Sequence, residues 1–303
     1  MISRRDFLPL LAGLGYRLVQ PPGARGADLP VFRAATSAEL LGDVNVNDAR
    51  AAMRSWADFV SLTLGMRVDY DPFVACTPAR LLDLMRRSAV HAVGCTTPEF
   101  VPLAPYVEPN TLLVDVLSGS QEYLLLVHSA SDLHTVADLR GHPLSLYRNE
   151  VTCLALDWLE TLLHGSNLDP GDRFFSAITP NPKLSRTVLP VFFRQADACL
   201  VNRRGFDTMC ELNPQLGRSL RAVASSPSYY TAIFAFHRDC PPAINRQFRT
   251  ALIDLAKTAT GKQLLALFQT TGFTTRDTSA LRSTLALVEA AERIRKRQGA
   301  IKS

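Results

Sequence analysis

The feature that most constrains this chain is an alternation of strand and helix patterns. Apolar runs at residues 31–35, 66–74 and 90–94 are separated by two helix patterns, at 47–64 and after Thr77-Pro78. The first helix pattern repeats its apolar residues every three to four positions, and the second has proline at its first helical position. The order β-α-β-α-β predicts a parallel sheet with right-handed crossovers.

A second alternation of the same kind follows. Strands are expected at 144–146, 174–178 and 198–201, with helices at 151–164 and from Asn181-Pro182. Extended segments at 111–117 and 122–127 lead into this unit, and segments at 220–224 and 231–236 lead out of it. Helix patterns at 242–258, 260–270 and 278–297 end the chain. We therefore predict an α/β fold of two lobes on a two-strand hinge, with a ligand between the lobes and the helical C-terminus packed on lobe one. Lobe one comprises residues 28–117 and 225–303, and lobe two comprises residues 118–224.

The first 27 residues have the features of an export signal. The motif Ser3-Arg4-Arg5-Asp6-Phe7-Leu8 matches a twin-arginine leader, and it is followed by an apolar run to residue 16, too short to span a bilayer. A receptor reads such a segment as an address, and it is then removed. We expect export to the periplasm through the twin-arginine route. The alternative is the basic N-terminus of a cytosolic protein.

The charge and cysteine patterns exclude several classes of protein. Residues 1–27 hold four arginines and one aspartate, so the formal charge of +5 falls to about +2 for the rest of the chain. This balance does not favour nucleic-acid binding, since the basic cluster at 293–297 lies at the end of the last helix, where it complements the helix dipole. The six cysteines lack metal-ligand spacing, so we expect no metal, although one or two disulfides stay open. No cofactor motif and no apolar stretch of 18 residues occurs.

Polar residues follow several of the predicted strands. Ligands of open α/β sheets bind beyond the carboxyl ends of the strands. Hydroxyl, amide and guanidinium groups together suit a small oxyanion, and the alternative is that some of these residues only cap the next helix. The predicted ligand-binding residues are Ser37, Thr96, Thr97, Tyr147, Arg148, Asn149, Asn202 and Arg203.

Catalytic patterns are absent from the sequence. No G-x-S-x-G, Walker, H-E-x-x-H or dinucleotide motif occurs, and the histidines are scattered. Glu99 lies close to Thr97, and we interpret it as an acid of a surface loop; the alternative is that it is a ligand group. We therefore predict no catalytic residues and no enzymatic activity.

Several segments carry a family resemblance: Gly94-Cys95-Thr96-Thr97-Pro98-Glu99-Phe100, the segments at 45–52, 133–141 and 188–199, and those at 205–217 and 224–227. Together they resemble the phosphate/phosphite/phosphonate-type periplasmic substrate-binding proteins of ABC transporters. The resemblance implies the type 2 periplasmic binding-protein fold. It also implies that Thr96 and Thr97, together with the turn from Tyr147 to Thr152, hold the ligand's oxyanion.

The sequence departs from this family in its second lobe. The turn at 147–152 has fewer hydroxyls and an added Arg148, and Asn202-Arg203-Arg204 stand where aminoalkylphosphonate binders carry acids. An amine-bearing ligand is therefore less favoured than a larger anion held by arginines. We expect an exported, monomeric binding protein that delivers a small anion, such as phosphate, phosphite or phosphonate, to an ABC transporter permease. The alternatives are a ligand-sensing partner of a membrane signalling protein and, less favoured, an enzyme on this fold.

Overall fold

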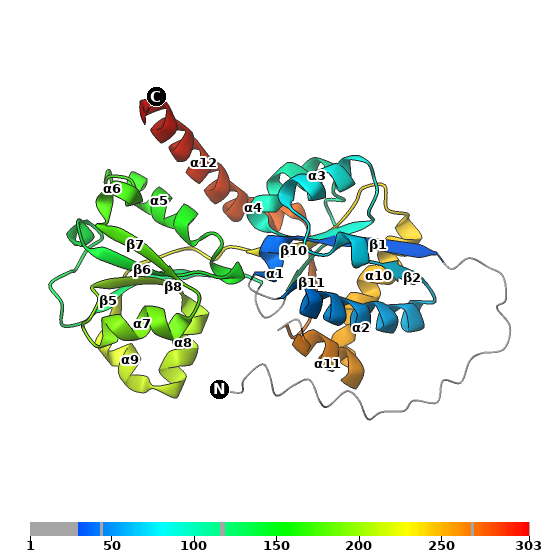
Figure 1. The fold of residues 1–303 in the computed structure, drawn as a ribbon, viewed down its shortest axis with the longest axis horizontal. Helices are drawn as coiled ribbons and strands as arrows, with labels where there is room; N and C mark the ends of the chain where they lie inside the picture. The colour runs from blue at the N-terminus through cyan, green and yellow to red at the C-terminus, as the bar shows by residue number, and fades with distance from the viewer. Residues whose placement is uncertain (1–29, 43–44, 116–118, 268–269, 303) are drawn as a thin grey trace.

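The chain folds into two α/β lobes, seen here in a computed structural model that describes residues 30–42, 45–115, 119–267 and 270–302 (Figure 1). The predicted leader, residues 1–27, lies outside the described residues. The two-lobed α/β fold with helices at the C-terminus is confirmed.

Lobe one is built on a sheet with the strand order β11-β4-β10-β3-β1-β2. Its strands are β1 (Val31–Thr36), β2 (Arg67–Asp69), β3 (Ala92–Thr96), β4 (Leu112–Asp115), β10 (Ala232–Phe236) and β11 (Phe273–Arg276). Strand β1 pairs in parallel with β2 and β3, as the alternation predicts, whereas β10 enters antiparallel between β3 and β4. The late part of the chain therefore returns to complete the first sheet.

Helices cover both faces of this sheet. Helices α2 (Val46–Leu64), α10 (Pro242–Asp254) and α11 (Ala259–Leu267) enclose a core around Phe32, Trp56 and Phe248. On the other face, α3 (Pro78–Arg86), α4 (Thr97–Phe100), η4 (Val101–Tyr106) and η8 (Thr278–Leu281) pack on a second core that contains Phe100. The remaining short elements are α1 (Ala38–Leu41), η3 (Asp71–Phe73) and η7 (Leu255–Lys257).

Lobe two repeats this layered plan on a sheet with the strand order β7-β6-β8-β5-β9. Its strands are β5 (Tyr123–His128), β6 (Pro143–Tyr147), β7 (Ala177–Asn181), β8 (Ala198–Asn202) and β9 (Leu220–Ser225). Helices α5 (Ala155–Gly165) and α6 (Gly171–Phe174) pack on one face, and α7 (Leu184–Phe192), α8 (Arg203–Leu212) and α9 (Pro214–Ser219) pack on the other. The elements η5 (Ala137–Leu139) and η6 (Glu150–Thr152) complete the lobe.

Two chain segments cross between the lobes, as predicted. The first crossing contains Gln121 and the second contains Tyr229, and the two are hydrogen-bonded to each other. The amide of Gln121 donates to the carbonyl of Tyr229 at 2.7 Å, and the amide of Tyr229 donates back to the carbonyl of Gln121 at 2.9 Å. On the lobe-two side, the amide of Ser226 donates to the carbonyl of Tyr123, whose own amide donates to Ser226 Oγ at 2.8 Å. On the lobe-one side, the amide of Tyr230 donates to Thr284 Oγ1 at 3.0 Å. The crossings form a paired hinge with anchored ends.

The last helix, α12 (Arg282–Lys302), differs from the prediction that the C-terminus packs on lobe one alone. It starts beside lobe one, but Leu287 and Val288 are buried in the core of lobe two. Farther along, Arg295 Nη1 donates to Asp157 Oδ1 of α5 at 2.7 Å. Burial raises the pKa of Asp157, although the charge of Arg295 opposes that rise. The physical reason is that the apolar stripe of α12 continues past the edge of lobe one, where α5 offers the apolar surface that covers it.

Four further expectations about local structure are wrong. The strand expected at 66–74 ends after Asp69, because the proline at position 72 starts a 3-10 turn. Asn181 ends β7 rather than opening a helix, since a residue before proline is held in extended backbone. Phe174 ends α6, and β7 begins only at Ala177. Finally, β11 forms where only a loop was expected between helices.

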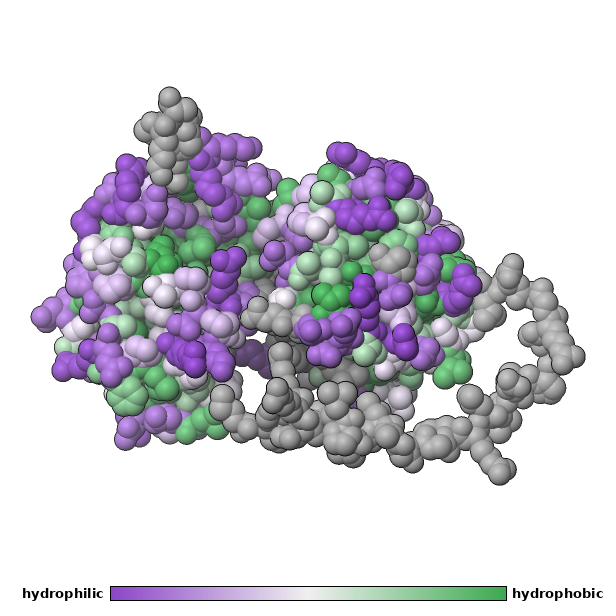
Figure 2. Space-filling view, viewed as in Figure 1, coloured by the Kyte–Doolittle hydropathy of each residue, from purple (hydrophilic) through white to green (hydrophobic). Residues whose placement is uncertain are grey.

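The outer surface that both lobes present in Figure 2 is mostly hydrophilic, since the apolar side chains are packed in the cores. Hydrophilic side chains cover most of the face shown in Figure 2 on both lobes, with smaller apolar areas between them. Within the part of the chain that the structure describes, no helix is long and apolar enough to cross a bilayer.

Candidate functional site

The lobe-one half of the predicted site consists of three buried hydroxyl residues, Ser37, Thr96 and Thr97. Ser37 caps α1, and its Oγ accepts from the amide of Leu40 at 2.8 Å. Thr97 Oγ1 donates to the carbonyl of Tyr230, in the second crossing, at 2.5 Å. Ser37 therefore has the helix-capping role that is the alternative to ligand binding, whereas Thr97 links α4 to the second crossing.

Thr96 works together with Glu99 in a capping box at the start of α4. Both the amide and Oγ1 of Thr96 donate to Glu99 Oε2, at 3.0 and 2.8 Å. Glu99 is only 8% exposed, so the prediction that it is an acid of a surface loop is wrong. The spacing Thr-x-x-Glu is the sequence signature of this motif, and it could have placed the carboxylate beneath Thr96.

The lobe-two half begins at the end of β6, in the turn from Tyr147 to Thr152. The side-chain amide of Asn149 donates to the Tyr147 hydroxyl at 2.8 Å, and the backbone amide of Asn149 donates to Thr152 Oγ1 at 2.9 Å. The Arg148 side chain is exposed, and among the described residues it forms no ion pair. Arg148 is therefore the cationic side chain of the predicted site that is available to a ligand. Thr152, which the prediction omitted, orders this turn.

The last pair of predicted residues contacts the first crossing. Asn202 is buried and donates through Nδ2 to Gln121 Oε1 at 3.1 Å, while its Oδ1 has no hydrogen-bond partner within the described ranges of the chain. Arg203 pairs through Nε with Glu122 Oε2 at 2.5 Å. An anion that approached Arg203 would compete with this carboxylate, so the structure gives Arg203 a role at the hinge that the sequence does not reveal.

Gly205 lies on the first turn of α8, and because it has no side chain, the side chain of Asn202 fits beside it. A Cβ at this glycine would lie 2.7 Å from Asn202 Oδ1 and 2.7 Å from Leu184 Cδ2. We expect Gly205→Ala to lower the free energy of unfolding by about 1–3 kcal/mol, because the extra methyl overpacks a filled site. Urea unfolding followed by circular dichroism measures this change.

Gly165→Ala is the matched control for that substitution. Gly165 ends α5 in the same lobe, and a Cβ there meets nothing within 4 Å. Alanine at this position is expected to leave stability unchanged or to raise it by up to about 1 kcal/mol. Equal losses in the two variants would show that the space beside Asn202 does not matter.

The two halves meet where α1 of lobe one lies against η6 of lobe two, while α4 is bonded to the second crossing. The backbones of α1 and η6 are in contact. Just after η6, Cys153 Sγ lies 3.7 Å from the carbonyl of Thr231, at the end of the second crossing. Burial raises the pKa of Cys153 to about 12, and the charges of Asp157, Glu99 and Glu39 add to that rise. We call this region, formed by α1, α4, η6 and the two crossings, the lobe seam. Acidic side chains, those of Glu99 and Glu39, also lie near this region.

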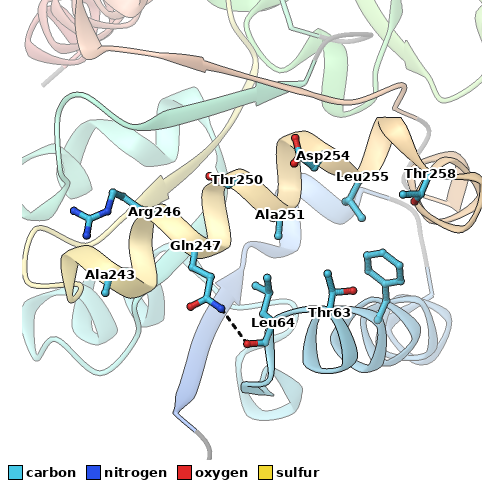
Figure 3. A pocket seen from close by; sticks show the side chains of 11 residues that line it. Thr63, Leu64, Ala243, Arg246, Gln247, Thr250, Ala251, Asp254, Leu255 and Thr258 are labelled. Atoms are coloured by element: carbon cyan, nitrogen blue, oxygen red, sulfur yellow. Dashed lines mark hydrogen bonds between the residues drawn. The ribbon is translucent and has the colours of Figure 1, made fainter. Parts of the chain in front are cut away.

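Two surface grooves lie away from the lobe seam. One, of about 510 Å³, runs between α2 and α10 on lobe one, where Gln247 Nε2 donates to the carbonyl of Leu64 at 3.0 Å (Figure 3). The other lies along α7 on lobe two and includes Arg186 and Phe193. Neither groove is lined by any of the eight predicted site residues. These grooves therefore do not test the predicted ligand-binding residues.

Metal-ligating side chains and cysteines do not form a second candidate site among the described residues. Among the described residues, no group of three or more histidine, cysteine or acidic side chains could hold a metal ion. All six cysteines are free thiols, so the disulfides that the sequence left open do not form in this structure.

Comparison with known proteins adds a family and a fold. The family model described as "ABC transporter, phosphonate, periplasmic substrate-binding protein" matches residues 41–281. No curated protein matches the chain.

Solved structures with the same architecture include XAC2383 from Xanthomonas citri, bound to chloride. It is 18% identical, with a TM-score of 0.63 over 88% of this chain and 99% of that one. PhnD1 from Prochlorococcus marinus, in complex with methylphosphonate, is 13% identical, with a TM-score of 0.57 over 85% and 96% of the two chains. The binding protein PA3383 of an ABC phosphonate transporter from Pseudomonas aeruginosa is 15% identical, with a TM-score of 0.54 over 91% and 100%. At these identities the likeness establishes the fold.

Proposed function

Because this chain belongs to the phosphonate-type periplasmic substrate-binding proteins of ABC transporters, we propose that it captures a small oxyanion at the lobe seam and delivers it to the membrane permease. In hinged binding proteins of this kind, discrimination comes from closure of the lobes around the ligand. The observation that carries the proposal is that buried polar groups of both lobes are anchored to the same two crossings. Thr97 is bonded to the second crossing, and Asn202 is bonded to the first.

Arg148 is the group that we propose contacts the anion directly. It lies at the end of β6, its guanidinium is exposed, and it forms no ion pair among the described residues. A guanidinium presents a planar set of donors that matches the oxygens of phosphate and phosphonate groups. We retain Ser37, Thr96, Thr97, Tyr147, Asn149, Asn202 and Arg203 as the shell that shapes the site around it.

The wider setting follows from family membership. Such proteins work in the periplasm with a permease as their partner, and we propose that residues 1–27 direct export through the twin-arginine route. We further propose that the protein acts as a monomer, by binding rather than by catalysis. We propose that lobe one is formed by residues 28–117 and 225–303 and lobe two by residues 118–224, except that Leu287 and Val288 of α12 pack in the core of lobe two. Incubation with methylphosphonate that left the ligand chemically unchanged would support a purely binding role, and its turnover would contradict that role.

A thermal-shift series on the chain from residue 28 onward tests the proposal. The ligands are phosphate, phosphite, several phosphonates, phosphoesters, sulfonates and dicarboxylates. At a concentration of about one hundred times Kd, a ligand stabilises the folded state by about 2.7 kcal/mol, and the melting temperature rises with it. We expect such a rise with phosphonate or a related oxyanion, and we expect Arg148→Ala to abolish most of it.

Arg218→Ala is the matched control, since Arg218 is an exposed arginine of the same lobe, at the end of α9. It should keep the full ligand-induced shift. The absence of a shift with every anion would contradict the proposed function. A shift that Arg148→Ala and Arg218→Ala reduce equally would instead contradict the role given to Arg148.

A further inference from the structure

One oxygen of Glu99 is buried without a hydrogen-bond partner. Glu99 Oε2 accepts both bonds from Thr96, and Oε1 accepts none from any residue that the structure describes. Among the described residues no basic side chain pairs with this carboxylate. Buried polar groups in folded proteins almost always have partners, so an isolated acceptor calls for an explanation. A donor supplied by a ligand is one such explanation.

The position of Glu99 supports a ligand as the missing partner. Two residues before it, Thr97 is bonded to the second crossing, and two residues after it, Val101 packs against the core of lobe two. Glu99 therefore lies at the lobe seam, where closure would bring a ligand. Its charge acts on Cys153 of lobe two and on Cys95 of β3, and burial raises the pKa of both thiols, which keeps them neutral. The acidic groups nearby are Glu39 of α1 and Asp157 of α5.

We propose that Glu99 Oε1 accepts a hydrogen bond from a hydroxyl group of the bound oxyanion, and that it thereby selects protonated phosphorus oxyanions over sulfonates. This inference rests on the proposed function and names the class of anion that the site accepts. An ionised carboxylate can only accept hydrogen bonds. A phosphorus oxyanion retains one acidic proton below its second pKa, which is about 6 for a phosphoester, whereas a sulfonate has no proton to donate. Beside Glu99, a sulfonate oxygen would meet a like charge with no hydrogen bond between them.

Glu99→Gln changes this acceptor with little effect on the surrounding structure. Glutamine supports a capping box as well as glutamate does, so its side-chain oxygen can keep both bonds from Thr96. Its NH₂ group then lies where Oε1 was. The substitution replaces an acceptor by a donor at one position, and a donor favours the unprotonated oxygens of a sulfonate.

Glu108→Gln is the matched control. Glu108 also belongs to lobe one, and it likewise accepts from a backbone amide, that of Asn110, and from the hydroxyl of Thr111. It lies outside the elements that form the lobe seam. Any effect of removing a carboxylate that caps local structure should therefore appear in both variants.

Isothermal titration calorimetry with methylphosphonate and methanesulfonate at one pH below 7 tests the inference. We expect the wild type and Glu108→Gln to prefer methylphosphonate by at least about tenfold, and we expect Glu99→Gln to reduce that ratio by about tenfold or more. Circular dichroism checks that each variant is folded.

The possible failures are distinguishable. If the wild type binds methylphosphonate but does not discriminate against methanesulfonate, or if Glu99→Gln keeps the wild-type ratio, the role of Glu99 is overturned and the proposed function stands. If the wild type binds neither these anions nor any other oxyanion, both are overturned.

Discussion

A charge placed at Val288 is expected to lower the free energy of unfolding by about 3–5 kcal/mol, because Val288→Asp would bury a carboxylate without a partner. Val288 is 2% exposed and lies in the core of lobe two, although its helix starts on lobe one. The aspartate would drive α12 away from α5 and so weaken the coupling between the lobes. Differential scanning calorimetry should show one transition in the wild type and two separated transitions in the variant.

Ala286→Asp controls for the added charge on the same helix. Ala286 is exposed, so its carboxylate stays in water, and stability should change by less than about 0.5 kcal/mol. If both variants retain a single transition at the wild-type temperature, α12 does not couple the lobes.

Truncation of Phe248 is the second large effect that we expect. Phe248 is fully buried in α10, where its ring stacks on Phe32 with centroids 3.6 Å apart and meets Trp56 edge-on at 5.4 Å. Phe248→Ala removes these contacts and leaves a cavity, so we expect a loss of about 3–5 kcal/mol in the stability of lobe one. Urea unfolding followed by tryptophan fluorescence measures this loss, because Trp56 adjoins the cavity.

Phe248→Leu separates the loss of volume from the loss of the ring. Leucine fills most of the space, so this variant should retain more than half of the stability that alanine loses. A loss below about 1 kcal/mol for Phe248→Ala would mean that the core of lobe one collapses around the gap or does not depend on this ring.

The fold could be predicted from the sequence wherever local periodicity decided it. The stripe of α2 and the Thr77-Pro78 start of α3 are local signals, and both helices form. The sheet partner of β11 and the surface that covers α12 depend on segments more than one hundred residues away. No local pattern specifies such contacts, so the prediction missed both. It also failed locally beside the prolines at positions 72 and 182, which override the strand and helix patterns around them.

The sequence could indicate that the predicted site residues lie at strand ends, but not which contacts they make. The rule that ligands bind beyond the carboxyl ends of strands led to Thr96, Thr97 and Asn202, all of which are bonded to a crossing or to the capping box of α4. The sequence could not show that Arg203 is paired with Glu122, because these residues are 81 positions apart. The position of Glu99, in contrast, could have been inferred from the capping-box spacing Thr-x-x-Glu.

The hydrogen bonds that anchor the second crossing show which backbone dihedral angles are free to change when the lobes turn. Ser226 is fixed to lobe two by its bonds with Tyr123, and Tyr230 is fixed to lobe one by Thr97 and Thr284. Between these points proline 227 has its φ locked by its ring, so rotation is left mainly to Ser228 and Tyr229. Because Tyr229 is paired with Gln121, the first crossing must turn with it. Any turn of the lobes about the crossings is therefore concentrated at these two residues, and it must also displace the contact between α12 and α5.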